Sequence, residues 1–440
     1  MSSSNKMGRL AFRNARLIDP ATGLDTRGGL LVENGKIADV GPKLFNTADP
    51  HDPEVMDCKG MVLAPGLIDC RVFTGEPGSE HRETLASASE AAAAGGVTTI
   101  VTMPNTDPVI DEAALVDFIK RRAAATAKVR VAPMAALTHA LQGERMTEIG
   151  LLREAGAVAF TDGDRSVSNA RVLRRALAYA ATHGALVAGH AEDPDLGSGA
   201  SMNEGEFATR LGIPGAPPAA ETIIVERDIR LVELTGARYH FSQISCRASL
   251  EAVIAAKKRG LPITCGVSAH HIAMNELDVG SYLTFRKVSP PLRSEADRAA
   301  MVEGVAEGHI DVIVSSHDPQ AADTKRLPFA AAAFGAVGLE TLLPAALTIV
   351  HNGHAKLIDV LKAVTAAPAK ILGLETGRLA KGAPADLVLF DPDEPFVLDA
   401  DKLHSRARNT AFEGRKFQGR ARMTFVGGEC VFDRAKEKKH

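Results

Sequence analysis

The sequence lacks the features of a secreted or membrane-spanning protein. None of its apolar segments approaches the roughly 18 uninterrupted residues that a membrane-spanning helix requires. The first residues, MSSSNKMGRLAF, do not contain the long apolar segment of a signal peptide. We therefore expect a cytoplasmic protein with no membrane partner.

Paired cysteines and concentrated basic charge are also missing. The five cysteines are widely spaced and include no C-x-x-C pair, which favours buried reduced thiols over disulfides or a zinc knuckle. The formal net charge is −3, and no basic face is evident, so nucleic acid is not an expected partner. With 45% hydrophobic residues, the composition is that of an ordinary globular protein, which we expect to form a homo-oligomer.

The two ends of the chain share a pattern of short alternating strands. The segments with this pattern are 10–19, 28–41, 54–66, 385–392 and 421–433. Two pairs, Asn34-Gly35 and Lys59-Gly60, lie between alternating runs, as the turns of β-hairpins do. The pattern predicts one small sheet domain built from both ends of the chain.

The middle of the chain alternates apolar strands with helical segments. The predicted strands are 65–73, 97–103, 129–137, 157–162, 185–191, 238–245, 261–268 and 310–318. Helical segments such as 81–96 and 169–184 end in glycine, as helices often do. This alternation predicts an α/β fold with a (β/α)8 barrel whose site lies at the carboxyl ends of the strands. We assign residues 64–372 to the barrel, and residues 1–63 and 373–440 to a small β-sandwich domain.

Polar residues gather where the predicted strands end. They include Asp69, Arg71, Asn105, Asp162, His190, Gln243, His270, His271, Ser316 and His317. The segments PGLIDCRVFTGEPG, MPNT, GHAEDPD and KVSPPLR closely resemble dihydroorotases of the amidohydrolase superfamily, and the resemblance covers nearly the whole chain. It implies a barrel with one or two zinc ions that activate water to open or close the dihydroorotate ring.

The ligands that the resemblance assigns to zinc are only partly present. The family's first strand ends in Asp-x-His-x-His, its fourth in an aspartate, its fifth and sixth in histidines, and its eighth in the catalytic aspartate. The remnant ligands are Asp162 and His190, and the lost ligand positions are Arg71, Phe73, Gln243 and Ser316, the last at the catalytic aspartate. Arg71 argues most strongly against a metal, because a guanidinium stays protonated. We expect an ion pair of Arg71 with Asp162 in place of the cluster, and zinc only if the site has altered ligands. A single adventitious metal near His190 and Asp162 is an open alternative.

The substrate contacts implied by the resemblance are reduced as well. The family's arginine that binds the substrate carboxylate corresponds to Gly75, and its asparagine partner remains as Asn105. Ser289 and Gln320 replace an asparagine and a histidine of the family. Losing a bidentate carboxylate contact weakens recognition by roughly 1.5–3 kcal/mol. Asn105 is therefore a remnant substrate-binding residue, and we assign no catalytic residue.

Three functions compete. The first is a dihydroorotase-like protein of pyrimidine biosynthesis without zinc or catalysis, acting as an assembly or regulatory partner of aspartate carbamoyltransferase, with residues 326–340 as a candidate lid or contact segment. The second is an active dihydroorotase or related cyclic amidohydrolase with an altered metal site. A hydantoinase would carry a carboxylated lysine on the fourth strand, where AVAFTDGD has none. The third is a binder of a small cyclic ureide that uses Asn105 and Arg71 without turnover.

Overall fold

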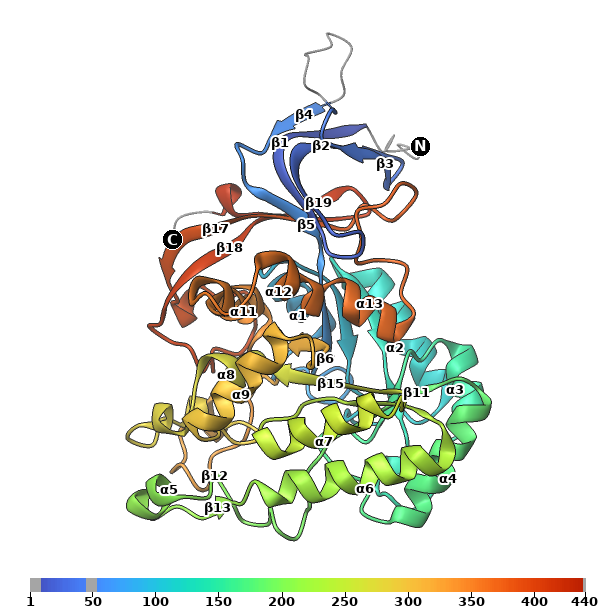
Figure 1. Cartoon of the computed structure of the whole chain (residues 1–440), viewed down its shortest axis with the longest axis vertical. Coiled ribbons are helices and arrows are strands. Elements are labelled where there is room, and N and C mark those ends of the chain that lie inside the picture. Colours follow the sequence, from blue (N-terminus) through green and yellow to red (C-terminus); the bar gives the residue numbers. More distant parts are fainter. Residues whose placement is uncertain (1–8, 45–53, 438–440) are drawn as a thin grey trace.

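The computed structural model describes residues 9–44 and 54–437 (Figure 1). The first eight residues, which make up most of the segment searched for a signal peptide, lie outside the described part. A sheet formed by the two ends of the chain lies at the top of Figure 1, above a larger body of strands and helices. Within the described ranges, no helix combines the length and the apolar character needed to cross a membrane.

The strands from both ends of the chain form one mixed sheet of eight strands. They are β1 (Leu10–Asp19), β2 (Leu24–Glu33), β3 (Lys36–Gly41), β4 (Glu54–Asp57), β5 (Val62–Pro65), β17 (Leu387–Val397), β18 (Lys416–Val426) and β19 (Glu429–Asp433). Their order is β19-β18-β17-β5-β1-β2-β3, with β4 also paired to β1. Phe12 on β1 and Phe425 on β18 have ring centroids 5.0 Å apart, although two strands separate β1 from β18 in that order. The sheet is therefore strongly curved, so that β1 and β18 face each other. The predicted sandwich is thus formed by one continuous sheet.

The two predicted hairpin turns have different outcomes. Asn34 and Gly35 have φ of 52° and 75° and join β2 to its antiparallel neighbour β3, as predicted. Lys59 and Gly60 also have positive φ, but β4 and β5 both run parallel to β1, so the hairpin predicted there is wrong. The amide of Gly60 donates to the carbonyl of Asn14 on β1 at 2.7 Å. The turn thus keeps the chain on the same edge of β1.

The predicted strands of the middle region are all present and parallel. They are β6 (Leu67–Val72), β7 (Val97–Thr102), β8 (Arg130–Pro133) with β9 (Ala135–Ala136), β10 (Phe160–Thr161), β11 (Leu186–Gly189), β14 (Arg238–Phe241), β15 (Ile263–Ser268) and β16 (Val312–Val314). They form two hydrogen-bonded sheets, β6-β7-β8 and β9-β10-β11-β14-β15-β16. At one junction Met134 separates β8 from β9, and at the other Val72 and His317 form a single bridge. Over the described residues, the predicted barrel is therefore not one continuously hydrogen-bonded ring.

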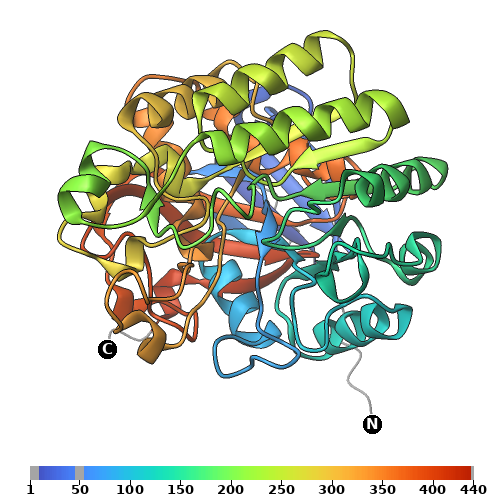
Figure 2. The same cartoon turned by 90° about the horizontal axis from the view of Figure 1, so that it is seen from below.

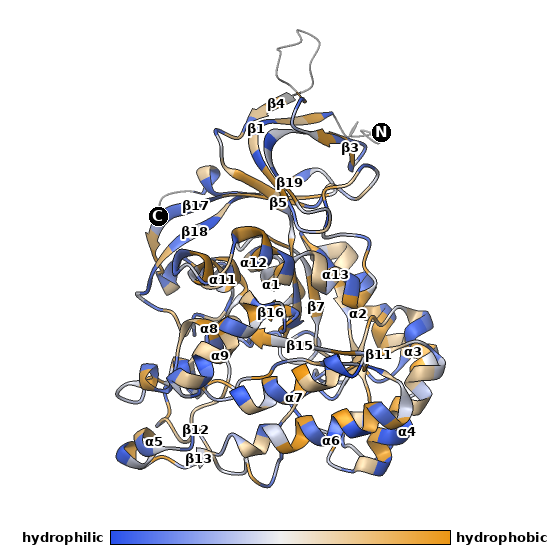
Figure 3. Cartoon of the chain, viewed as in Figure 1, coloured by the Kyte–Doolittle hydropathy of each residue, from blue (hydrophilic) through white to orange (hydrophobic). Residues whose placement is uncertain are grey.

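Helices surround these strands, as Figure 2 shows. They are α1 (Leu85–Ala94), α2 (Ala113–Thr126), α3 (Ile149–Ala155), α4 (Ala170–Thr182), α6 (Ala219–Thr235), α7 (Arg247–Lys258), α9 (Glu295–Ala306), α11 (Leu342–His351), α12 (Leu357–Val364) and α13 (Ala366–Leu372), with the shorter α5 (Glu206–Leu211), α8 (Ala269–Ala273) and α10 (Ala322–Lys325). Helix α1 begins where the hydroxyl of Thr84 accepts a hydrogen bond from the amide of Ser87 at 3.1 Å. Helix α4 buries Leu173, Leu177 and Ala180, which share one face, and Figure 3 shows hydrophilic residues on other parts of the same helix.

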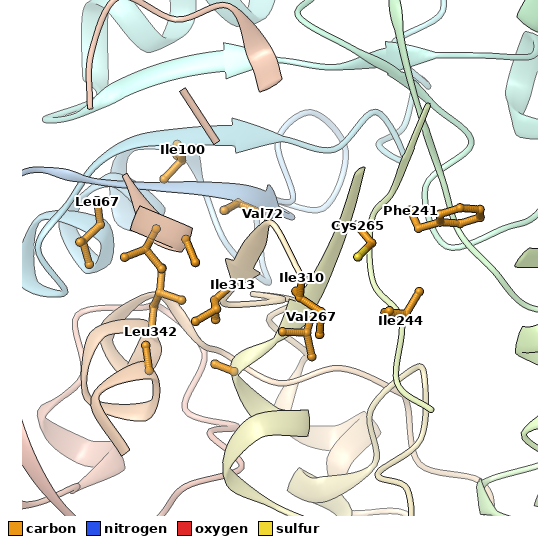
Figure 4. Close-up of a cluster of buried hydrophobic side chains, with 14 of the residues drawn as sticks. Leu67, Val72, Ile100, Phe241, Ile244, Cys265, Val267, Ile310, Ile313 and Leu342 are labelled. Atoms are coloured by element: carbon orange, nitrogen blue, oxygen red, sulfur yellow. The ribbon is translucent and has the colours of Figure 1, made fainter. Parts of the chain in front are cut away.

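The main core lies between the strands and this layer of helices. Leu67 of β6, Ile100 of β7 and Leu342 of α11 belong to one buried cluster, part of which Figure 4 shows. All six residues of β7 are buried, because each face of the strand meets other protein. This packing fixes the positions of the strand ends, and with them the loops that form the cavity described below.

The cysteines follow the prediction in part. All five are free thiols, and Cys58, Cys70, Cys246 and Cys265 are buried. Burial raises the pKa of the Cys58 thiol to about 12 and that of Cys246 to about 11, which keeps both protonated at neutral pH. Cys430 on β19 is exposed, so the prediction of burial is wrong for this residue.

Candidate functional site

A cavity of about 450 Å³ is lined by residues from the loops that follow the strands of the central body. The predicted site residues in its walls are Arg71, Phe73, Asn105, Ser289, Ser316 and His317. Four further charged residues line the cavity that the sequence reasoning did not single out, namely Asp164, Glu192, Lys287 and Asp318. The segment 326–340 contributes Ala330, Phe334, Gly335 and Ala336, so it forms part of the wall.

Arg71 is paired with Asp164, and the predicted ion pair with Asp162 is wrong. The Arg71 side chain is 7% exposed, and its Nη2 donates to Oδ1 of Asp164. Asp162 instead accepts hydrogen bonds from the amide of Thr138, at 2.8 Å, and from the Thr138 hydroxyl. Gly163, with φ of 71°, turns the chain between the two aspartates. The Asp162 carboxylate therefore holds the loop that contains Thr138, whereas the Asp164 carboxylate faces the cavity.

The Asp164 carboxylate is held at both oxygens. Besides the bond from Arg71 to Oδ1, Nδ2 of Asn105 donates to Oδ2 at 3.1 Å. Partial loss of solvent opposes ionisation of Asp164, whose side chain is still 46% exposed, but the positive charge of Arg71 outweighs it and lowers the pKa below its usual value. Burial raises the pKa of Asp162, against the hydrogen bonds from Thr138. Of the two, Asp164 is the carboxylate stabilised as an anion.

His190 is a buried histidine with a carboxylate partner. Its Nε2 lies 3.1 Å from Oε2 of Glu192, and its Nδ1 has no partner among the described residues. Burial opposes ionisation of Glu192, but the hydrogen bond with His190 outweighs it and lowers the pKa of Glu192. The Ser289 hydroxyl donates to the same Oε2 at 3.4 Å. His190 is thus engaged by Glu192, which lines the cavity, and not by Asp162.

Ser316 and His317 adjoin but do not form a catalytic pair. Ser316 has φ of 53°, in the left-handed region that a serine rarely adopts, so its backbone is strained at the cavity wall. Nδ1 of His317 accepts a hydrogen bond from the amide of Gly338 at 3.2 Å, and its Nε2 lies 3.6 Å from Glu83. Within the described chain, no hydrogen bond joins Ser316 to His317. The structure thus offers no activated serine nucleophile.

Gln243 is buried without hydrogen bonds. Its side chain is 1% exposed, and neither Oε1 nor Nε2 has a partner in the described residues. A buried amide in this state costs about 1–3 kcal/mol for each unsatisfied group. Nothing among the described residues gives this buried amide a structural role.

The side chains present do not fit zinc. In the part of the chain that the structure describes, no three His, Cys, Asp or Glu side chains are grouped to hold a metal ion, whereas Zn²⁺ takes about four such ligands. Arg71 adds a permanent positive charge to the cavity wall. The charged and polar side chains that line the cavity are thus the groups on which its chemistry can be argued, and the absence of zinc from the protein stays a prediction.

The four residues that the sequence reasoning missed carry most of the charge in the cavity. Lys287 donates to the carbonyl of Ala330 at 2.8 Å and lies 4.4 Å from the ring centroid of Phe334. Asp318 accepts from Arg82 at 2.7 Å, and burial, reinforced by the charge of Asp164, raises the pKa of Asp318 to about 6. A signal was present for each, because all four lie within three residues of a predicted site residue or inside a segment quoted for the resemblance.

Gly75 occupies a turn with no room for a side chain. Its φ is 69°, and a Cβ added there would lie 2.6 Å from the carbonyl oxygens of Ser79 and Glu83. An arginine at this position would require the backbone to shift. The local fold at Gly75 therefore leaves no room for the arginine that the resemblance implies at this position.

Comparison with known proteins finds similarity to dihydroorotases and to the amidohydrolase family. Residues 60–249 match the family model "Dihydro-orotase-like", and residues 311–432 match "Amidohydrolase family". The dihydroorotase of Wolbachia sp. subsp. Drosophila simulans (strain wRi) is 44% identical over 425 residues, 96% of each chain, and that of Desulforapulum autotrophicum is 42% identical over 97% of this chain and 99% of the relative.

Solved structures share the architecture. The L-hydantoinase from Arthrobacter aurescens superposes with a TM-score of 0.86 at 25% identity, covering 96% of both chains. The dihydropyrimidinase from Brevibacillus agri superposes with a TM-score of 0.83 at 21% identity, covering 97% of this chain and 95% of the other. The arrangement of a TIM-type barrel with a β-sandwich domain is thus common to this chain and to these proteins.

Proposed function

The chain belongs to the dihydroorotase family, and on this premise we propose that it serves pyrimidine biosynthesis without zinc-dependent catalysis of its own. It acts as an assembly or regulatory partner of aspartate carbamoyltransferase. The observation that carries the loss of catalysis is the ion pair of Arg71 with Asp164 in the cavity wall. A guanidinium stays protonated and repels a metal cation, and Arg71 stands at a position where the family has a metal-binding histidine.

The choice of aspartate carbamoyltransferase as the partner is supported by the family resemblance and by the presence of the predicted strands and helices. The predicted strands, the helices around them and the terminal sheet are all present. The resemblance, in contrast, implies that the ligand positions are altered. A role that depends on the fold alone needs these strands and helices and tolerates altered ligand positions. Assembly with the preceding enzyme of the same pathway is such a role.

An active dihydroorotase with an altered site is the second candidate. It is favoured by the names of the relatives, which are dihydroorotases matched along almost their whole length. The names favour activity, and the side chains in the cavity favour its loss. In this candidate the reaction would run without the family's metal cluster, or with zinc on a changed ligand set.

One paired measurement separates the two candidates. Purified full-length protein is analysed for zinc and assayed for ring opening of dihydroorotate and ring closure of carbamoyl aspartate. We expect less than stoichiometric zinc and no turnover above the uncatalysed rate. Turnover, with or without stoichiometric zinc, would establish the second candidate and overturn the first.

The partner requires its own experiment. We expect aspartate carbamoyltransferase from the same cell to co-purify with this chain and to lose activity or assembly when the chain is removed. The control is the same carbamoyltransferase expressed alone. If it assembles and works normally by itself, the proposed partnership is wrong.

A further inference from the structure

A second cavity lies between the terminal sheet and the helices next to it. Its volume is about 740 Å³, which is within the range of roughly 300–1,000 Å³ that small-molecule sites have. Its walls come from β17 and β18 and from α8, α9 and α11, on the side of the molecule where Figure 1 labels these elements. In the part of the chain that the structure describes, it shares no lining residue with the cavity of the candidate site.

The walls of the second cavity carry positive charge without negative charge. Arg298, Arg415 and Lys416 line it, and none of its described lining residues is an aspartate or a glutamate. Arg298 is already paired, because its Nε and Nη2 donate to the carboxylate of Glu295 at 2.7 and 2.5 Å. Arg415 and Lys416 make no ion pair within the described residues, so these two cations remain for a ligand.

Aromatic rings hold the guanidinium of Arg415 in place. Its central carbon lies 5.6 Å from the ring centroids of both Phe412 and Phe417, within the reach of a cation–π contact. The two rings are buried and meet edge to face at 5.4 Å. Among the described residues, the guanidinium makes no hydrogen bond. The rings therefore fix its position and leave its N–H donors free.

The surroundings of Arg415 favour a bound anion. The residue is half-buried, and burial lowers its pKa; the charge of Asp278 opposes this effect, whereas those of Arg286 and Arg298 add to it. Arg286 is itself engaged, since its Nε donates to the carbonyl of Ala411 at 3.1 Å. Three guanidiniums thus act on one another here, and an anion at Arg415 would offset their repulsion.

The shape and chemistry of the walls fit a phosphate ester. A guanidinium fork beside an ammonium group offers several donors and two positive charges, which suits a phosphate dianion better than a carboxylate with one negative charge. Apolar side chains make up much of the remaining wall and give a carbon portion of the ligand a place to pack: Ile272, Ala273, Pro395, Phe396 and Val397.

We propose that Arg415 and Lys416 bind the phosphate group of a small phosphate ester in the second cavity, with its carbon portion against the apolar wall. The proposal uses none of the residues that line the cavity of the candidate site. It therefore goes beyond the proposed function and does not depend on it.

Isothermal titration calorimetry at low ionic strength and about pH 8, where phosphate is a dianion, tests the site with three probes. Phenyl phosphate carries a ring and a dianion, inorganic phosphate carries the dianion alone, and benzoate carries a ring with a single charge. We expect phenyl phosphate to bind at least about tenfold more tightly than benzoate, because its second charge meets Lys416. Inorganic phosphate should bind more weakly than phenyl phosphate, because it buries no apolar surface.

Variants of the two cations locate the binding. Arg415→Gln should weaken phenyl phosphate binding at least about tenfold, and Lys416→Gln several-fold, because a charge-assisted contact is lost in each. Arg27→Gln is the matched control, since it removes the same charge from an exposed position on β2 that does not line the cavity, and we expect it to bind as wild type does. Arg71→Gln, which alters the cavity of the candidate site, should also leave the affinity unchanged.

Circular dichroism verifies that each variant is folded. Lys416 is exposed, so Lys416→Gln decides if Arg415→Gln does not fold. The site is overturned if neither phosphate probe binds, if benzoate binds as tightly as phenyl phosphate, or if both variants keep the wild-type affinity. Weaker binding in Arg71→Gln would place the probe in the cavity of the candidate site and would also contradict the proposal. Turnover of dihydroorotate, which would overturn the proposed loss of catalysis, moves none of these readouts.

Discussion

Two arginine–aspartate pairs in this molecule have opposite exposure. Between the central body and the terminal sheet, Arg130 donates from Nε and Nη2 to Asp386 at 2.6 and 3.0 Å, and Asp386 is 1% exposed while Arg130 is 43% exposed. In the cavity, Arg71 is the buried partner and Asp164 the exposed one. The first pair buries its anion and the second buries its cation.

The difference indicates what each pair does. Asp386 also accepts from the amide of Gly427 at 2.8 Å, so its carboxylate is held from two elements and has no route to water. Asp164 is 46% exposed and pairs with Arg71 at the wall of the cavity. The first arrangement is suited to holding two parts of the fold together, and the second to neutralising a buried guanidinium beside the cavity.

The largest expected effect comes from breaking the first pair. Arg130→Ala should lower the free energy of unfolding by about 2–3 kcal/mol, because it leaves the buried Asp386 charge with one amide donor. Urea unfolding measures the change. Arg16→Ala is the control, since Arg16 makes a similar two-point contact with Asp25 where both side chains are well exposed, and the expected loss there is about 0–1 kcal/mol. Equal losses in both variants would contradict the assignment of Arg130–Asp386 as the structural pair.

A smaller loss is expected from the second pair. Asp164→Asn should destabilise the free protein by about 1 kcal/mol at neutral pH, because Arg71 faces a cavity that water can enter. The pKa of Asp164 lies below its usual value of 3.8, so its contribution is present above pH 4 and is lost as the pH falls through the lowered pKa. The stability difference between wild type and Asp164→Asn should therefore shrink on acidification below about pH 4. Unfolding titrations from pH 7 to pH 2 measure it, and a difference that grows in acid would contradict the pairing.

The smallest effect is expected at Asp318, which lies near the Arg71–Asp164 pair. The pKa of Asp318 is raised to about 6, first by burial and then by the charge of Asp164. A raised carboxyl pKa means that the folded state binds more protons, so this group's effect is to lower stability as the pH rises from about 4 to about 6. Asp164→Asn should lower the pKa of Asp318 and make that loss shallower, as carbon-13 NMR of the carboxyl groups can follow. Asp69, whose pKa is about 6 through burial, is an internal reference that should not move.

The sequence predicted the elements of the fold better than their connections. Each predicted strand of the middle region is present, because buried parallel strands need continuous apolar residues. The turn at Lys59 and Gly60 has the left-handed backbone of a hairpin turn, yet it joins two strands that both run beside β1. A local turn signal specifies the backbone of two residues, whereas pairing depends on which strand is already at the edge.

The residue types of the site could be predicted from the sequence, but the pairing of its side chains could not. The resemblance aligned Arg71 and Phe73 with histidine positions of the family, and both residues line the cavity. The ion pair was assigned to Asp162, but Asp162 is held by Thr138 and Arg71 reaches Asp164. Two aspartates separated by a glycine are equivalent candidates in a sequence, and the turn at Gly163 decides which one faces the cavity.

The sequence by itself thus determined the fold class, the family and the arginine in the cavity wall, because these depend on local pattern and residue identity. Tertiary structure decided which carboxylate that arginine meets and which partner of the pair is exposed. Coulombic and hydrogen-bonding interactions act over a few ångströms between residues 93 positions apart, as Arg71 and Asp164 are, so only the folded chain sets them.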